Sequence, residues 1–318
     1  MKKPLKAAAE NKILRIMKKV YYYKDELNDD FAGAKIEAKP LVGFKYGKHN
    51  FLWNVGAFIA YRLIATPVAK LFNLLVYGEK IKNAKVLKGY KKGGFYLYGN
   101  HTMSMGDAFT PSMISFPKKA HILVGPQAVE IPAMGTIVPM MGGVPVANTI
   151  AGLKEFTAEV NRLSAEGKAV VIYPEAHIWP YYTGIRPFKD TSFRYAAENL
   201  KPVFCFTKTF HKRLIGSLPR IETYVDGPFL PDESLPVKQR AKKLRNEVYE
   251  TMTERSKLSD YAFIEYVKVH SEVDFIPEKV SENALKRSSA FDEQNVSAEP
   301  PVSADECETQ CERTENNI

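Results

Sequence analysis

The sequence predicts an α/β fold with a mixed, mostly parallel sheet flanked by helices. Between residues 85 and 257, short apolar runs of strand length alternate with longer stretches of helical periodicity. Strands are expected near 85–89, 94–99, 120–124, 144–147, 168–173, 202–208 and 220–226, and helices near 106–115, 149–166, 190–199 and 236–257. Because strands separated by helices usually pair in parallel, residues 81–270 are expected to form one α/β domain.

Two segments before this domain have helical character. Residues 2–21 place apolar side chains on one side of a helix and most of the lysines elsewhere, which describes a basic amphipathic helix. Residues 51–77 are apolar almost all round, and Pro67 indicates two short helices that meet near Thr66. No uncharged stretch there is long enough to cross a bilayer. The pair is either buried as core or lies in a membrane interface, and residues 1–80 are expected to face a membrane.

Charge is distributed unevenly along the chain. The 318 residues include 45 Lys and Arg against 36 Asp and Glu, yet residues 271–318 hold 12 acids and only 4 bases. Their polar composition, with few aromatic residues, predicts a disordered acidic tail. The remaining body is strongly basic, which suits nucleic acid, an anionic membrane surface or an acidic small substrate. No nucleic-acid-binding motif accompanies the charge, so no nucleic-acid partner is expected.

The cysteines and the beginning of the chain indicate the compartment. Cys205, Cys307 and Cys311 are too few to form a disulfide framework. The first twenty residues lack the apolar core of a secretory signal. A reduced, cytosolic environment is therefore expected. Around His121 and His177 no further side chains have the spacing of metal ligands, so no metal site is expected.

Polar side chains follow two of the expected strands. The run FYLYGNHTMSMGDAF places Asn100 and His101 directly after a strand, with Asp107 at the start of the next helix. The run KAVVIYPEAH ends a second strand at Glu175 in the same way. Ligands bind at the carboxyl ends of strands in open α/β sheets, and histidine exchanges a proton near neutral pH. A catalytic site built from both strand ends is therefore predicted.

These segments resemble the motifs of the glycerolipid acyltransferases related to 1-acyl-glycerol-3-phosphate acyltransferase. The stretches GNHTMSMGD and YPEAH are similar to the family's N-H-x4-D and F-P-E-G-T-R motifs. Three further segments follow in the family's order, namely GGVPVANT at 142–149, GIRPFKDTSFRYAAEN at 184–199 and KPVFCF at 201–206. The ordered set covers roughly residues 85–230 and is more specific than any one motif. The apolar segment before it resembles the family's membrane-docking pair of helices.

Three departures from the family pattern affect the expected site. Five residues separate His101 from Asp107, where the family has four. One extra residue rotates a helical position by about 100°, so Asp107 reaches the imidazole only if the turn bulges. Asn148 and Ile178 stand where the family has its phosphate-binding arginines. Another group must therefore bind the phosphate if the acceptor carries one.

The resemblance implies roles for the candidate residues. His101 would act as general base on the acceptor hydroxyl, and Asp107 would orient and stabilise the imidazolium, as the acid of a serine-hydrolase triad does. Asn100 and Glu175 are expected to bind or orient the substrate. Arg186 and Lys189, with Arg194 or Lys208 as further candidates, would supply the missing positive charge to a phosphate.

The expected function is O-acyl transfer from acyl-CoA or acyl-carrier protein to a lysophosphatidate-like lysolipid in phospholipid synthesis. The thioester is a co-substrate, and no cofactor is expected. The predicted location is the cytoplasmic face of a membrane that contains anionic lipid, with peripheral or monotopic attachment. Two alternatives stay open: an acyltransferase for an acceptor without a phosphate, and a non-catalytic lipid- or membrane-binding protein whose site has drifted. A working site should bring His101, Asp107 and Glu175 together, whereas a drifted site need not.

Overall fold

A computed structural model of the chain describes residues 19–32, 38–41, 43–47, 50–90, 92–130 and 133–269. The chain divides into the units Met1–Lys268 and Val269–Ile318, and the fold below is that of the first. The acidic tail, with Cys307 and Cys311, lies outside the described residues. So does the helix expected over residues 2–21, except for its last three residues, which belong to a strand.

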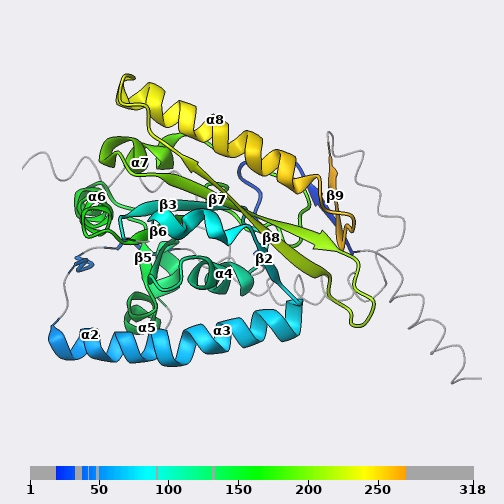
Figure 1. Ribbon diagram of the computed structural model, residues 1–318, viewed down its shortest axis with the longest axis horizontal. Coiled ribbons are helices and arrows are strands. Elements are labelled where there is room, and N and C mark those ends of the chain that lie inside the picture. The colour runs from blue at the N-terminus through cyan, green and yellow to red at the C-terminus, as the bar shows by residue number, and fades with distance from the viewer. Residues whose placement is uncertain are drawn as a thin grey trace, which may run out of the picture. The chain divides into compact units, whose positions relative to one another are not determined.

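A seven-stranded sheet forms the centre of the first unit (Figure 1). Its order is β2 (Lys80–Lys82), β8 (Arg220–Phe229), β7 (Val203–His211), β3 (Phe95–Gly99), β6 (Ala169–Ile172), β4 (Ala120–Val124) and β5 (Gly143–Pro145). Only β7 and β8 pair antiparallel, and the other neighbours are parallel. The predicted α/β class with a mixed, mostly parallel sheet is confirmed.

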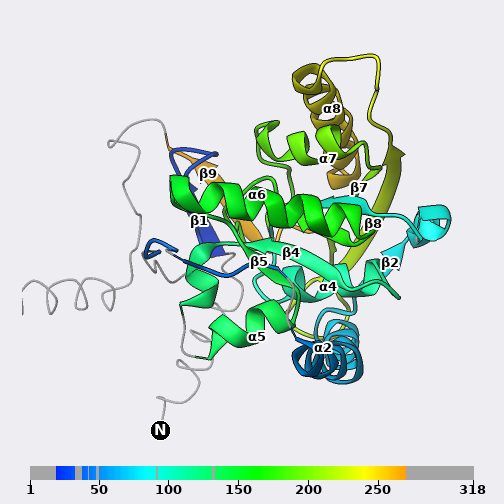
Figure 2. The ribbon, with the colours of Figure 1, turned by 90° about the vertical axis from the view of Figure 1, so that its left-hand side faces the viewer.

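Helices cover both faces of this sheet (Figures 1 and 2). The helices are α4 (Gly106–Ile114), α5 (Met134–Met140), α6 (Ile150–Ala165), α7 (Arg194–Asn199) and α8 (Val237–Ser256), with short 3-10 turns at Pro126–Val129 and Thr191–Phe193. Strand β3 is buried on both sides, and its side chains alternate between two cores. Tyr96 and Tyr98 pack with α6, α7 and α8, whereas Phe95 and Leu97 pack with Ile114 of α4.

Six of the seven expected strands and all four expected helices of the α/β domain are present. The strand expected near 85–89 is wrong, because Ala84–Tyr90 forms a 3-10 helix and the edge strand β2 precedes it. Leu87 of this helix is buried in the core under Phe95 and Leu97. One buried apolar residue in a short segment suits a helical turn as well as a strand, so the sequence pattern could not separate the two.

A single helical rod spans Phe51–Tyr77, in place of the two helices expected to meet at Thr66. It consists of α2 (Phe51–Phe58), a π-helical stretch Ile59–Ala65, α3 (Thr66–Phe72) and a second π-helical stretch Asn73–Tyr77. Pro67 lacks an N–H, but the preceding π-helical turn absorbs this defect: the backbone N–H and the hydroxyl of Thr66 both donate to the carbonyl of Tyr61. The helix therefore continues through the proline.

One side of this rod is buried against the domain and the other is apolar and exposed. Ala57, Tyr61, Ala69 and Tyr77 lie on the buried side, and α3 packs on α4. The large exposed side chains are Phe51, Leu52, Val55, Phe58, Ile59, Leu63, Ile64, Val68, Leu71, Leu74 and Leu75. The alternative that the whole segment is core is therefore wrong. Among the described residues this rod is the one helix that is long and apolar enough to span a membrane, a criterion of length and composition alone.

A separate two-stranded ribbon pairs β1 (Lys19–Tyr23) with β9 (Ile264–Lys268) in parallel. Its aromatic side chains contact the loop after β6: Tyr266 stacks on Trp179 with ring centroids 4.9 Å apart, and Tyr23 meets the same indole edge-on at 4.7 Å. The indole N–H of Trp179 donates to the carbonyl of Asp29 at 2.7 Å. The ribbon thus holds in place the loop that begins at Glu175.

Candidate active site

Three neighbouring strands, β7, β3 and β6, end at the same edge of the sheet and bring the candidate residues together. His101 follows β3, Glu175 follows β6, and Lys208 lies in β7 two residues beyond Phe206, the partner of Gly99. Close approach of these strands requires glycine at position 99. A Cβ there would lie 2.1 Å from the ring of Phe206. The two predicted strand ends therefore form one site.

His101 and Asp107 form a hydrogen-bonded dyad. Nδ1 of His101 lies 2.7 Å from Oδ2 of Asp107. The extra residue in the spacing does no harm, because residues 102–105 form a turn and the helix α4 begins only at Gly106. The carboxylate turns back over this turn and also accepts the backbone N–H of Met103 at 2.9 Å. The bulged turn on which the dyad depends is therefore present.

Lys208 completes the dyad from the neighbouring strand. Its ammonium donates to Oδ1 of Asp107, and both side chains are almost fully buried. Burial alone would disfavour the charged carboxylate, but Lys208 and the hydrogen bond from His101 outweigh it and lower the pKa of Asp107. Asp107 therefore stays ionised beside His101. The sequence indicated Lys208 only as a further cation for a phosphate, and its contact with Asp107 was not foreseen.

The face of the imidazole rests on Tyr173, the last residue before Pro174. The two rings are stacked, with centroids 4.5 Å apart and planes 19° apart. The phenol hydroxyl donates to the backbone carbonyl of Asp107. Burial and the nearby charge of Asp107 raise the pKa of Tyr173 well above its ordinary value, so the phenol stays neutral. Tyr173 fixes the plane of the imidazole without taking a proton.

Glu175 is buried behind the dyad and organises the loop. Its Oε2 accepts the backbone N–H of His101 at 3.2 Å, and its Oε1 accepts the backbone N–H of Arg186 at 3.2 Å. Burial raises the pKa of Glu175, although the adjacent Arg186 guanidinium and these hydrogen bonds oppose the effect. The carboxylate therefore ties three segments together. Its geometry is that of a positioning residue rather than of a group that touches the substrate.

Arg186 is not placed to meet a substrate phosphate. Its side chain is 1% exposed, lies 3.5 Å from Oε2 of Glu175 and donates to the carbonyls of Glu175 and His177. The guanidinium also lies over the indole of Trp179 at 5.0 Å. Burial lowers the pKa of Arg186, and Glu175 opposes this shift. Arg186 is thus the internal counter-ion of Glu175, which corrects the expectation of a ligand-binding arginine.

The remaining candidates differ in placement. Asn100 is buried and forms two hydrogen bonds with the backbone of Lys208, at 3.1 Å and 2.9 Å, so it joins β3 to β7 rather than reaching for a substrate. Asn148 exchanges hydrogen bonds with the backbone of Lys39 and Leu41. Lys189 is exposed, and among the described residues no hydrogen bond or ion pair joins it to the dyad. Its role in binding a phosphate stays a prediction.

This arrangement suits proton abstraction by an imidazole. With Nδ1 held by an ionised carboxylate, the other ring nitrogen, Nε2, is left to accept a proton, and the carboxylate stabilises the imidazolium that results. The side chain of His101 is 18% exposed, whereas that of Asp107 is 3% exposed. The base can therefore meet a ligand while its acid partner is shielded. A fixed base of this kind activates a hydroxyl for attack on an acyl group.

A protein family and a solved structure are similar to this chain. Residues 74–207 match the family model described as Acyltransferase. Among solved structures the chain is similar to the crystal structure of the 1-acyl-sn-glycerophosphate (LPA) acyltransferase PlsC from Thermotoga maritima. That similarity has a TM-score of 0.48 and 14% identity, and covers 66% of this chain and 89% of that one. No curated protein sequence matches the chain.

Residues 74–207, which include His101, Asp107 and Glu175, therefore match an acyltransferase family, as the sequence motifs predicted.

Proposed function

We propose that the protein transfers a fatty acyl group from a thioester, acyl-CoA or acyl-carrier protein, to the hydroxyl of a lysophosphatidate-like lysolipid. The observation that carries this proposal is the 2.7 Å contact between Nδ1 of His101 and the buried carboxylate of Asp107 at the carboxyl edge of the sheet. A positioned base of this kind is what a weakly acidic acceptor hydroxyl requires.

The reaction proceeds by direct transfer. Nε2 of His101 takes the proton from the acceptor hydroxyl as its oxygen attacks the thioester carbonyl. Collapse of the tetrahedral intermediate releases the thiolate, which receives the proton from the imidazolium. Asp107 stabilises the imidazolium, and Lys208 keeps Asp107 ionised. The acceptor itself is the nucleophile, so no acyl-enzyme forms.

We infer that the exposed apolar side of Phe51–Tyr77 docks on a membrane. Eleven large apolar side chains lie on this side, and a surface helix with one buried and one apolar exposed side suits an interface. Replacing Leu63 and Leu71, which are 62% and 56% exposed, by glutamate should abolish flotation with vesicles while the protein stays folded. Unchanged flotation of this variant would contradict docking through the rod. We propose the cytoplasmic face of the membrane as the place of attachment, because the chain has few cysteines.

An acceptor without a phosphate is the second candidate. It is favoured because Arg186, which was expected to bind a phosphate, is engaged internally, and Asn148, at the position of a family arginine, binds backbone groups. The strongly basic body favours the phosphate ester instead. The intact dyad argues against the third reading, a non-catalytic protein with a drifted site, because His101, Asp107 and Glu175 lie together.

Purified protein, incubated with labelled acyl-CoA and a panel of acceptors, tests these proposals. Lysophosphatidate, other lysophospholipids, monoacylglycerol and simple alcohols should be compared in the same detergent. Preferred acylation of lysophosphatidate supports the phosphate acceptor. Acylation of the uncharged acceptors alone would overturn that assignment and leave the acyltransferase chemistry standing. The same panel with acyl-carrier protein as donor separates the two thioesters.

A further inference from the structure

A cavity of about 620 Å³ lies at the edge of the sheet opposite the dyad. Lys118 and Lys119 directly precede β4, and Lys168 directly precedes β6. Strand β6 pairs in parallel with both β3 and β4, so all three strands run in the same direction. His101 follows the carboxyl end of β3. The cavity therefore lies at the amino ends of these strands and is separate from the catalytic residues.

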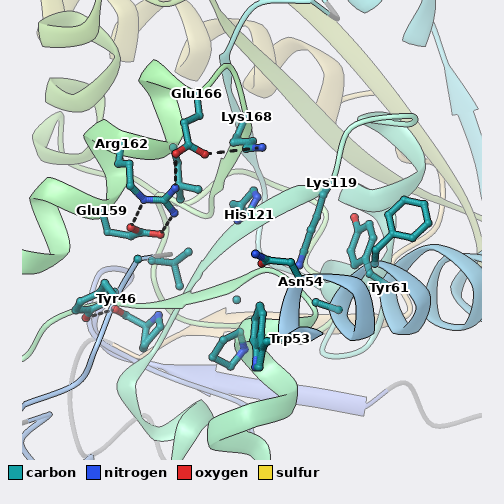
Figure 3. A pocket seen from close by; sticks show the side chains of 18 of the residues that line it. Tyr46, Trp53, Asn54, Tyr61, Lys119, His121, Glu159, Arg162, Glu166 and Lys168 are labelled. Atoms are coloured by element: carbon teal, nitrogen blue, oxygen red, sulfur yellow. Dashed lines mark hydrogen bonds and ion pairs between the residues drawn. The ribbon is translucent and has the colours of Figure 1, made fainter. Parts of the chain in front are cut away.

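Helices α2 and α6 form two walls of this cavity (Figure 3). Trp53, Phe58 and Tyr61 line it from the apolar rod, and Glu159, Arg162 and Glu166 line it from α6. Strand β5 and residues 44–47 close it further. Cationic side chains and the aromatic side chains of the rod thus line the same cavity.

The cations in the cavity outnumber the acids, which pair with only two of them. Arg162 binds both lining carboxylates, with distances of 2.7 to 2.8 Å to Glu159 and 2.7 Å to Glu166 (Figure 3). Lys168 lies 3.9 Å from Glu166. The other lining cations are Lys45, Arg62, Lys118 and Lys119, and none of them makes an ion pair with another described residue. Their charge is left for a ligand to neutralise.

Neutral groups hold three of these cations in place. Lys119 donates to the carbonyl of Met140 at 2.7 Å, Lys118 to that of Gly167, and Arg62 to that of Pro117. The Nη1 atom of Arg62 is buried and has no hydrogen-bond partner in the described part of the chain. A buried cationic nitrogen without a partner is costly, and an anion in the cavity would offset its charge even without contacting it.

Burial, together with the neighbouring cations, shifts the pKa of two titratable groups that line the cavity. Burial, with the charge of Lys168, lowers the pKa of Lys119 to about 8. Burial and the surrounding cations lower the pKa of His121, which also lines the cavity, to about 3, so this imidazole is neutral at physiological pH. An anion bound here would favour the charged form of Lys119 and would in turn be bound more tightly.

We propose that this cavity binds the phosphate headgroup of an anionic phospholipid. The position of Phe58 indicates that the phosphate belongs to a lipid. Phe58 lines the cavity and is also 60% exposed on the apolar rod. A phospholipid with its phosphate among Lys118, Lys119 and Arg62 can therefore leave its acyl chains along a surface continuous with the exposed apolar side. The site would anchor the rod to anionic bilayers at a point remote from catalysis, and it does not depend on the dyad.

Lipid binding can be measured without an acyl-transfer assay by following the fluorescence of Trp53, which lines the cavity. The full chain is titrated with soluble dihexanoyl phosphatidylglycerol, with dihexanoyl phosphatidylcholine and with inorganic phosphate, while the emission of Trp53 is followed. Phosphatidylglycerol should give a saturable change that phosphatidylcholine does not give. The change should disappear in Trp53→Phe, which retains Trp179. Equal responses to both lipids, or saturation by inorganic phosphate over the same concentration range, would overturn the proposal.

Two charge-matched variants separate the cavity from general attraction. Lys119→Gln removes one cation inside the cavity. Lys70→Gln removes one exposed cation of the rod Phe51–Tyr77 that does not line the cavity. Lys119→Gln should raise the half-saturating concentration of the anionic lipid by about ten-fold or more, as expected for one charge-assisted contact. Lys70→Gln should leave it within about two-fold. Equal effects of the two variants would contradict a specific site. Acyl transfer by the wild-type protein is measured in a separate assay. The proposed lipid site can therefore fail while the proposed acyl transfer stands, and the reverse.

Discussion

Lys208 and Asp107 form a buried ion pair that joins strand β7 to the beginning of α4 beside the imidazole of His101. Their contact links the folding of the sheet to the chemistry of the site. Oδ1 of Asp107 accepts a hydrogen bond from the ammonium of Lys208, and Oδ2 is hydrogen-bonded to Nδ1 of His101. We therefore expect removal of the cation to lower both stability and the rate of acyl transfer.

Lys208→Met should lower the free energy of unfolding by about 3 kcal/mol, because it leaves a buried carboxylate without its cation. Denaturant unfolding measures this loss. Lys212→Met is the matched control, since Lys212 is exposed just beyond the same strand and should change stability little. Adding Asp107→Asn to Lys208→Met should recover part of the loss. Additive losses in the double variant would mean that the two side chains are not coupled.

Asp107→Asn should lower the rate of acyl transfer by roughly 100-fold, because the imidazolium loses its stabilising charge. The variant should also change how stability depends on pH. The pKa of Asp107 is depressed in the folded protein, so its stabilising contribution is fully present above the unfolded carboxyl value of about 3.9. That contribution is lost as the pH falls through the lower folded value. The stability difference between wild type and variant should therefore shrink in acid; a constant difference would contradict this.

Tyr173 should act through its ring more than through its hydroxyl. Tyr173→Phe keeps the stacking on His101 and loses one hydrogen bond to a backbone carbonyl, which should cost about 1 kcal/mol of stability and little activity. Tyr173→Leu removes the flat support and should lower kcat more than it changes KM. Equal kcat values for the two variants would show that the stacked ring does not position the base.

Lys189 carries the prediction about the acceptor phosphate. Lys189→Ala should raise the KM for lysophosphatidate roughly ten-fold, since one charge-assisted contact is lost, while the KM for an uncharged acceptor stays unchanged. Thermal unfolding should not change, because the side chain is exposed. Lys201→Ala, which removes another lysine after α7, serves as the control. Equal KM values for wild type and Lys189→Ala would remove this residue from the site.

The dyad could be predicted from the sequence because both residues lie in one short segment after a strand. The chain between them forms a turn, so the helical rotation that made the spacing look unfavourable never applies. Lys208 could not be assigned in the same way. It lies 101 residues after Asp107, and only the parallel pairing of β3 with β7 brings it there.

Two other differences have similar causes. The motif segment around Arg186 was identified, but charge in a sequence does not reveal burial, and this guanidinium is enclosed with Glu175. The break expected at Pro67 is absent because a π-helical turn compensates for the missing N–H. In both cases the deciding contacts arise from the folded structure, and a sequence pattern does not display them.

The central claim is that His101 is the base of an acyl transfer. The most direct measurement is the initial rate at which purified protein moves a labelled acyl group from acyl-CoA to lysophosphatidate, compared with His101→Ala. Circular dichroism and thermal unfolding verify that the variant is folded. The wild-type protein should form product, and His101→Ala should be slower by roughly 1,000-fold. A folded His101→Ala variant that turns over at a rate close to wild type would contradict the account.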